Sequence, residues 1–150
     1  MKNNGVMILD FGSQYTKLIA RRIREENIYS EIFKHNISID EVKRFNPAAI
    51  ILSGGPSSVF SINALRIDPE ILEYNKPILG ICLGMQLLSE WGHEGLLEDD
   101  KSRENGLGLI KGEVVNLKKL GCIERIPHMG WNTVTWLNSN SLLEGIPSGA

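Results

Sequence analysis

The sequence is short of cysteine and has no long apolar run. Its two cysteines, Cys82 and Cys122, lie far apart and lack the spacing of metal ligands. The N-terminus has no signal-peptide pattern, and no apolar stretch is long enough to span a membrane. These absences exclude a disulfide-stapled scaffold and predict a protein of the reducing cytoplasm.

Neither sign of charge dominates the sequence. The 16 basic and 18 acidic side chains give a formal net charge of -2 and are scattered along the chain, which gives no support to nucleic-acid binding. The sequence also lacks internal repeats, low-complexity tracts, a dinucleotide fingerprint, a P-loop and Cys/His clusters, so we expect no metal, flavin or nucleotide cofactor. At 150 residues, the chain is long enough for one domain with its own core.

Apolar runs alternate with segments of helical periodicity in the first part of the chain. Strands are predicted at 6–9, 30–33, 48–52 and 77–79, and helices begin near Tyr15, after Ser38, around 69–74 and at Met85. This order predicts an α/β fold with an open, mostly parallel sheet flanked by helices, whose ligand crevice lies beyond the carboxyl ends of the strands. Residues 107–117 and 132–137 have β-like patterns and predict an antiparallel extension in the last third.

Cys82 follows one of the predicted strands and precedes a predicted helix. It is flanked by Gly80 and Gly84, as in a nucleophile elbow, where a sharp turn needs glycine on either side. The N-terminus of the following helix would favour the thiolate over the thiol. The alternative is a small buried cysteine that closes the strand, but the paired glycines favour a nucleophile.

Gly54 and Gly55 follow another predicted strand. Glycine N–H groups at a strand end can face a developing oxyanion without a Cβ in the way. The Leu83 N–H, directly after the nucleophile, would be the complementary donor. The alternative is a plain turn, since the segment 53–56 reads Ser-Gly-Gly-Pro.

These motifs resemble those of class I glutamine amidotransferases, whose glutaminase domain has a Gly-x-Cys-x-Gly elbow in an α/β fold. The resemblance covers nearly the whole chain. Residues 8–16 and 51–56 resemble the amidotransferase domain of GMP synthase, whereas 80–88, 106–110 and 127–132 resemble the glutaminase subunit of imidazole glycerol phosphate synthase.

The resemblance implies that Cys82 attacks glutamine, forms a γ-glutamyl thioester and releases ammonia to a synthase partner. Gln86 and Glu94 would help to bind the glutamine, although an ordinary solvent-facing glutamate remains the alternative for Glu94. The residues that would face the synthase subunit, near the oxyanion region, are Pro127, His128, Met129, Gly130, Trp131 and Asn132. The alternative for this segment is a buried turn anchored by Trp131.

A cysteine nucleophile needs a general base and an orienting acid, which the resembling family supplies in a late His-Pro-Glu segment. The three histidines here, His35, His93 and His128, are not followed by Pro-Glu. We therefore expect residues 1–150 to be an amidotransferase domain without its C-terminal portion, either a truncated chain or a homologue that has lost the pair. On its own the chain is expected to release little glutamate.

The resemblance leaves several destinations for the ammonia. The main hypothesis is a glutaminase subunit of imidazole glycerol phosphate synthase, in histidine biosynthesis, which would form a heterodimer with a (β/α)8-barrel cyclase. The alternatives are the amidotransferase domain of GMP synthase, an ammonia donor for the amidation of cell-surface sugars, and a non-catalytic scaffold module in which Cys82 is incidental.

Overall fold

The structure is a computed structural model that describes residues 5–56, 66–93, 104–105, 107–137 and 141–149. Its first four strands are β1 (Val6–Asp10), β2 (Ser30–Lys34), β3 (Ala49–Leu52) and β4 (Ile78–Gly80). The helices between and after them are α1 (Thr16–Glu25), α2 (Ile39–Phe45), α3 (Glu70–Glu73) and α4 (Leu83–Leu88). The predicted alternation of strands and helices is confirmed.

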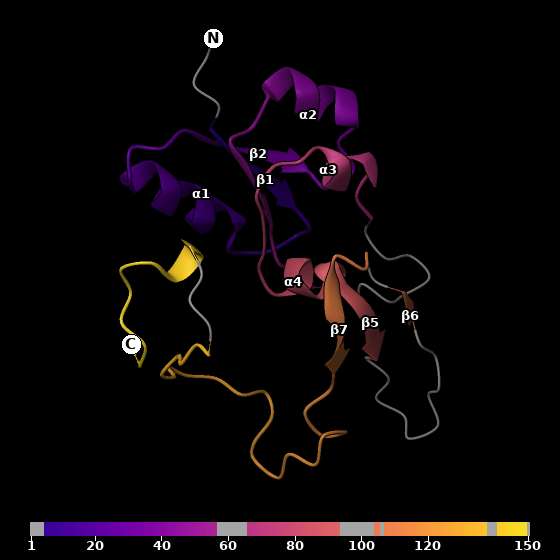
Figure 1. Ribbon diagram of the computed structural model, residues 1–150, viewed down its shortest axis with the longest axis vertical. Coiled ribbons are helices and arrows are strands. Elements are labelled where there is room, and N and C mark those ends of the chain that lie inside the picture. Colours follow the sequence, from indigo (N-terminus) through magenta and orange to yellow (C-terminus); the bar gives the residue numbers. More distant parts are fainter. Residues whose placement is uncertain (1–4, 57–65, 94–103, 106, 138–140, 150) are drawn as a thin grey trace. The chain divides into compact units, whose positions relative to one another are not determined.

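The four strands form one parallel sheet in the order β2-β1-β3-β4. β2 lies beside β1 (Figure 1), and β3 and β4 follow on the other side of β1, so the order of the strands reverses between β1 and β3. Such a switch point opens a crevice at the carboxyl ends of the two central strands. This edge of the sheet is where a ligand is expected.

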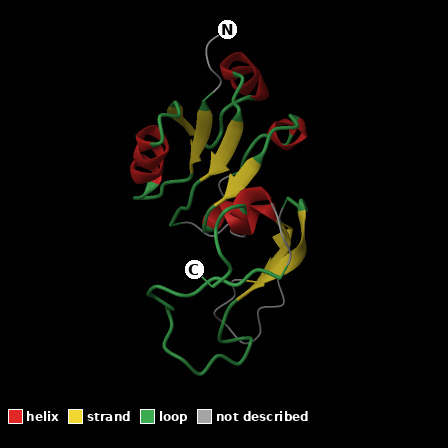
Figure 2. Ribbon diagram, turned by 60° about the vertical axis from the view of Figure 1, so that its left-hand side comes forward, coloured by secondary structure: helices red, strands yellow, loops and turns green. Residues whose placement is uncertain are grey.

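Both faces of the two central strands, β1 and β3, are buried, as the continuous apolar run of β3 predicts. Because side chains alternate along a strand, Met7 and Leu9 join one cluster and Ile8, between them, joins the other. The smaller cluster contains Ala20 of α1, and the larger one contains residues of α2, α3 and α4. Helices accordingly lie on both sides of these strands (Figure 2).

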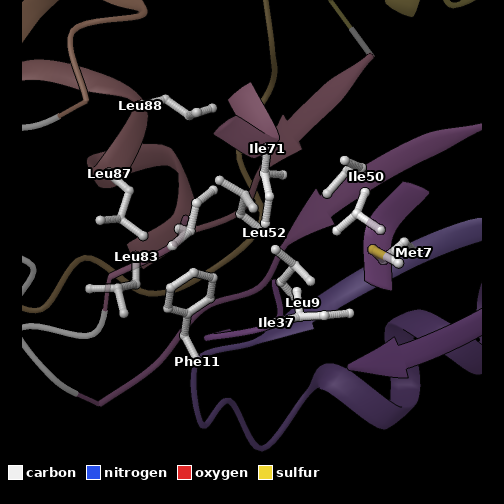
Figure 3. Packing of buried hydrophobic residues seen from close by; sticks show 12 residues of the cluster. Met7, Leu9, Phe11, Ile37, Ile50, Leu52, Ile71, Leu83, Leu87 and Leu88 are labelled. Atoms are coloured by element: carbon white, nitrogen blue, oxygen red, sulfur yellow. The ribbon is translucent and has the colours of Figure 1, made fainter. Parts of the chain in front are cut away.

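The larger cluster extends from the sheet to the helix that follows β4. Phe11, directly after β1, is fully buried with Leu83, Leu87 and Leu88 of α4, and these side chains gather with Leu52 in Figure 3. Burial of each such side chain contributes about 1.5–3 kcal/mol. The start of α4 is therefore held by the same core as the central strands.

A second sheet follows α4 within the same part of the chain. It has the order β6-β5-β7 and comprises β5 (Ser89–His93), β6 (Glu104–Asn105) and β7 (Ile110–Val115). β7 falls inside the predicted segment 107–117, but β5 pairs with it in parallel and with β6 in antiparallel orientation. The expected extension is thus a mixed sheet.

The predicted strand at 132–137 is wrong. These residues form no strand, and the side chain of Leu137 is 96% exposed, so the alternating pattern has no core face to bury. The segment lies in the second of two compact units, Met1–Asn116 and Leu117–Ala150. In the part of the chain that the structure describes, no helix is long and apolar enough to cross a membrane.

Helix α2 begins with the predicted capping box. The Ser38 hydroxyl accepts a hydrogen bond from the Glu41 N–H at 3.4 Å, and the Glu41 carboxylate accepts one from the Ser38 N–H at 3.2 Å. The hydrogen bonds from the backbone and hydroxyl of Ser38 lower the pKa of Glu41. Because the folded-state pKa is lowered, this stabilisation is present above the unfolded-state pKa and is lost as the pH falls through the folded-state value.

Replacement of Ser38 by alanine is expected to lower the free energy of unfolding by about 1 kcal/mol at neutral pH. The loss of unfolding free energy should be smaller in acid, below the lowered pKa of Glu41, because a protonated carboxyl no longer completes the capping box. Urea unfolding of wild type and Ser38→Ala, at neutral pH and in acid, measures this loss. Glu41→Gln, which does not titrate, is the control. An equal loss at both pH values would contradict the prediction.

Candidate active site

Three loops meet at the carboxyl edge of the parallel sheet. They are residues 11–15 after β1, 53–56 after β3 and 81–82 after β4. The first two loops touch, since a Cβ on Gly12 would lie 3.3 Å from Cδ of Pro56. The switch point therefore brings together the Gly54-Gly55 pair and Cys82, which the sequence analysis singled out.

Cys82 has the backbone of a nucleophile elbow. Its φ of 55° and ψ of -113° are rare for a residue with a side chain, and it is the N-cap of α4. Such a conformation costs about 1–3 kcal/mol and persists only where the surroundings enforce it. The elbow predicted from the sequence is thus present, and it is strained.

The glycines on either side of Cys82 are required by space. A Cβ on Gly80 would lie 2.6 Å from the carbonyl oxygen of Gly84, and a Cβ on Gly84 would overlap the carbonyl oxygen of Leu52. The Gly84 N–H donates to the Ser53 carbonyl at 3.1 Å. The turn into α4 is therefore pressed against the end of β3, which fixes the conformation of Cys82.

The sulfur of Cys82 lies beside the Gly54 loop and is accessible. Cys82 is exposed and free of disulfide bonding, so it is not the buried cysteine of the alternative interpretation. A Cβ on Gly54 would lie 3.6 Å from Sγ of Cys82. Since Gly54 has no side chain, the space next to the sulfur on this side stays open to a substrate atom.

The predicted oxyanion donors lie close to Cys82 along the chain or across the loops. Among the described residues, the N–H groups of Gly54, Gly55 and Leu83 donate to no backbone carbonyl. Gly55 is packed so closely that a Cβ would overlap the carbonyl oxygen of Phe11 and lie 2.9 Å from Cδ2 of Leu83. The loop 53–56 and the first residue of α4 thus offer N–H groups of the kind that an oxyanion hole requires.

Sequence reasoning missed a polar network that ties these loops together. The buried Ser53 hydroxyl accepts a hydrogen bond from the Phe11 N–H at 3.1 Å and donates to the Gly54 carbonyl at 3.0 Å. The Asp10 carboxylate accepts from the Gly12 N–H at 2.9 Å and from the Thr16 hydroxyl at 2.8 Å. A polar Asp-x-Gly-Ser run directly after a buried strand was the signal available in the sequence.

Of the two residues predicted to bind the substrate glutamine, the structure describes only Gln86. Gln86 is half-buried in α4, one turn after Cys82, and its N–H donates to the Cys82 carbonyl at 3.0 Å. Gln86 therefore lies one turn into the helix that Cys82 caps. Glu94 lies outside the described residues.

The predicted partner segment, residues 127–132, lies in the unit Leu117–Ala150. Trp131 and Met129 are 103% and 85% exposed, so the alternative of a buried turn anchored by Trp131 is wrong. The side-chain amide nitrogen of Asn132 lies 2.8 Å from Nε2 of His128. The segment thus presents apolar side chains to solvent, while two of its polar side chains contact each other.

Among the described side chains, no histidine is placed as a general base for Cys82. His35, after β2, is half-buried and packs on Phe11 with ring centroids 5.6 Å apart. His128 is exposed in the other unit. The side chain of His93 lies outside what the structure describes.

Comparison with known proteins matches the chain, over residues 7–149, to the family model described as glutamine amidotransferase class-I. A glutamine-hydrolyzing GMP synthase of Brachyspira hyodysenteriae is 44% identical over 99% of this chain and 28% of its own length. The corresponding enzyme of Natranaerobius thermophilus is 42% identical over 99% of the chain and 28% of its length. The enzyme of Oceanobacillus iheyensis is 51% identical over 79% of this chain and 24% of its own length. The chain thus spans about a quarter of the length of these relatives.

These relatives favour the GMP synthase alternative over the main hypothesis of imidazole glycerol phosphate synthase, and they give no support to histidine biosynthesis. The similarity in the second half rested on the short segments 80–88, 106–110 and 127–132, whereas the relatives match along nearly the whole chain.

The strain at Cys82 predicts an inverted order of stability for two substitutions. An alanine is normally more stabilising than glycine, by about 0.4–1 kcal/mol. At φ 55° we expect the reverse, with Cys82→Gly more stable than Cys82→Ala by about 1 kcal/mol, because glycine relieves the strain. Urea unfolding of the two variants measures the difference.

Met85 offers the matched control for that comparison, because it is half-exposed inside α4. The free energy of unfolding of Met85→Ala should exceed that of Met85→Gly by about 1 kcal/mol. A lower stability of Cys82→Gly than of Cys82→Ala would show that the elbow stores no strain.

Proposed function

Because this chain belongs to the class-I glutamine amidotransferase family, we propose that it hydrolyses glutamine at Cys82 and supplies ammonia to a synthase of the GMP synthase kind. The observation that carries the proposal is an exposed cysteine in a strained elbow, near the N–H groups of Gly54, Gly55 and Leu83, which donate to no backbone carbonyl of the described residues.

The proposed chemistry is acyl transfer through the sulfur. The Cys82 thiolate attacks the carboxamide carbon of glutamine, a C–S bond forms, and the backbone N–H groups stabilise the oxyanion. The C–N bond then breaks, and ammonia leaves after the nitrogen takes a proton from a general acid. Water attacks the γ-glutamyl thioester, which releases glutamate and restores the thiol. Gln86, one turn into α4, and Glu94 are proposed to bind the substrate.

The general base and the acid that orients it are proposed to be residues outside 1–150. None of the three histidines is followed by Pro-Glu, and no described histidine ring other than that of His35 packs on a residue of the three loops. The domain in 1–150 would then hold the nucleophile and the oxyanion donors, with a base and an orienting acid added to it.

The GMP synthase assignment is supported by the identity of 42–44% that extends over 99% of the chain. A fused synthase region, rather than a separate barrel cyclase, is therefore the proposed acceptor of the ammonia. The exposed Met129 and Trp131 support a contact of segment 127–132 with that region, because large apolar side chains at a surface often mark an interface. Sugar amidation has no observation in its favour.

We expect 6-diazo-5-oxo-norleucine, a glutamine mimic, to alkylate Cys82. The diazo carbon takes up a proton, nitrogen gas leaves and a C–S bond forms. Peptide mass spectrometry should find the adduct on Cys82, and excess glutamine should prevent it. Cys82→Ser is the negative control, and the second free cysteine, Cys122, serves as an internal one. Absence of labelling at Cys82 would favour a scaffold module.

The full protein that contains this sequence should form GMP with glutamine as the nitrogen source. In Cys82→Ser, glutamine-dependent GMP formation should fall below detection, while formation with ammonium salt should persist, because the substitution removes only the nucleophile. Chromatographic quantitation of GMP measures both. If the glutamine-dependent activity survives in Cys82→Ser, or if neither nitrogen source yields GMP, the assignment is overturned.

A further inference from the structure

We propose that Ser13 is an additional hydrogen-bond donor to the carboxamide oxygen of bound glutamine, alongside the backbone N–H groups. The inference rests on the proposed function and adds a side chain from the loop after β1 to a site otherwise built from the loops after β3 and β4.

Ser13 and Cys82 lie against the same side of Gly54. A Cβ placed on Gly54 would lie 3.6 Å from Oγ of Ser13, 3.6 Å from Sγ of Cys82 and 3.3 Å from Cβ of Cys82. Oγ and Sγ are therefore no more than twice 3.6 Å apart, and both border the space in front of Gly54.

This separation suits a carboxamide about to be attacked. Reacting atoms in a productive complex lie about 3–3.5 Å apart, so the carboxamide carbon would lie at about that distance from Sγ. Its oxygen lies about 1.2 Å from that carbon. Turned toward Ser13, that oxygen comes within hydrogen-bond reach of Oγ, about 2.7 Å for a hydroxyl donor.

The hydroxyl of Ser13 is held in place with its proton unused. Its oxygen accepts a hydrogen bond from the Tyr15 N–H at 3.1 Å, and its carbonyl accepts one from the Thr16 hydroxyl at 3.1 Å. Thr16 is buried and also donates to the Asp10 carboxylate. Among the described residues, the Ser13 O–H has no acceptor. A donor fixed in advance costs little reorganisation when an oxyanion forms.

Two other roles for Ser13 make different predictions. If Ser13 only supports its turn by accepting from Tyr15, its loss lowers stability and leaves the reactivity of Cys82 unchanged. If Ser13 bonds to the sulfur itself, its loss changes the rate with every thiol reagent. A donor to the carboxamide oxygen matters only for reagents that carry a carbonyl in that position.

The experiment compares two reagents on the full protein that contains residues 1–150. The ketone oxygen of 6-diazo-5-oxo-norleucine stands for the carboxamide oxygen, whereas methyl methanethiosulfonate is small and has no carbonyl. In Ser13→Ala, Cys82 should react about tenfold more slowly with 6-diazo-5-oxo-norleucine, as for loss of one oxyanion donor at a partly exposed position. It should react with methyl methanethiosulfonate at the wild-type rate. Peptide mass spectrometry of Cys82 gives both rate constants.

Two isosteric variants guard against a folding defect. Ser13→Thr retains a hydroxyl and Ser13→Val does not, so only Ser13→Val should repeat the tenfold loss. Ser38→Ala controls for destabilisation at a distance, because Ser38 follows β2, which is separated from β4 by two strands. Urea unfolding checks that each variant is folded.

The outcomes separate the inference from the proposed function. Wild-type labelling of Ser13→Ala and Ser13→Val by the glutamine mimic, equal losses with both reagents, or an equal loss in Ser13→Thr each overturns the role of Ser13 and leaves the function intact. If wild-type Cys82 reacts with methyl methanethiosulfonate but not with the glutamine mimic, the glutamine pocket itself is refuted, and the role of Ser13 with it.

Discussion

The site depends on the contact between the turn at Cys82 and the end of β3. Gly84 lies against the Leu52 carbonyl so closely that no Cβ fits, and its N–H bonds to the Ser53 carbonyl. An unstrained turn would move the sulfur away from Gly54, so the unfavourable backbone of Cys82 and its position next to the Gly54 loop have one cause. The core that buries Leu83, Leu87 and Leu88 supplies the free energy that keeps this contact in place.

The reversal of strand order explains why residues so distant in sequence meet. Parallel strands place their carboxyl ends at one edge, and the reversal between β1 and β3 leaves the loops after them diverging around a crevice. The Ser53 hydroxyl, between Phe11 and Gly54, keeps the two loops in register without adding a charge. A neutral hydroxyl at this link suits the proposed reaction, in which negative charge develops, because a carboxylate in the place of the Ser53 hydroxyl would oppose it.

Much of this arrangement could be predicted from local sequence. The strands were evident because buried parallel strands are continuous apolar runs, and α2 because Ser38 and Glu41 have capping-box spacing. Cys82 was found because glycine is needed where backbone meets backbone. The mixed sheet was mispredicted because pairing partners such as β5 and β7 are chosen by tertiary contacts. Ser13 was missed because an Asp-x-Gly-Ser run reads as an ordinary turn until its position beside Gly54 is known.

The residues that identify the reaction are poor guides to the fate of its product. Gly80, Cys82 and Gly84 are dictated by the geometry of an elbow, which any glutaminase of this fold must satisfy whatever accepts the ammonia. Motifs around the nucleophile therefore matched a histidine-pathway subunit as readily as a GMP synthase. Discrimination has to come from positions that the chemistry leaves free, including exposed side chains such as Met129 and Trp131, and from similarity spread over the whole chain. By that measure the GMP synthases are the better match.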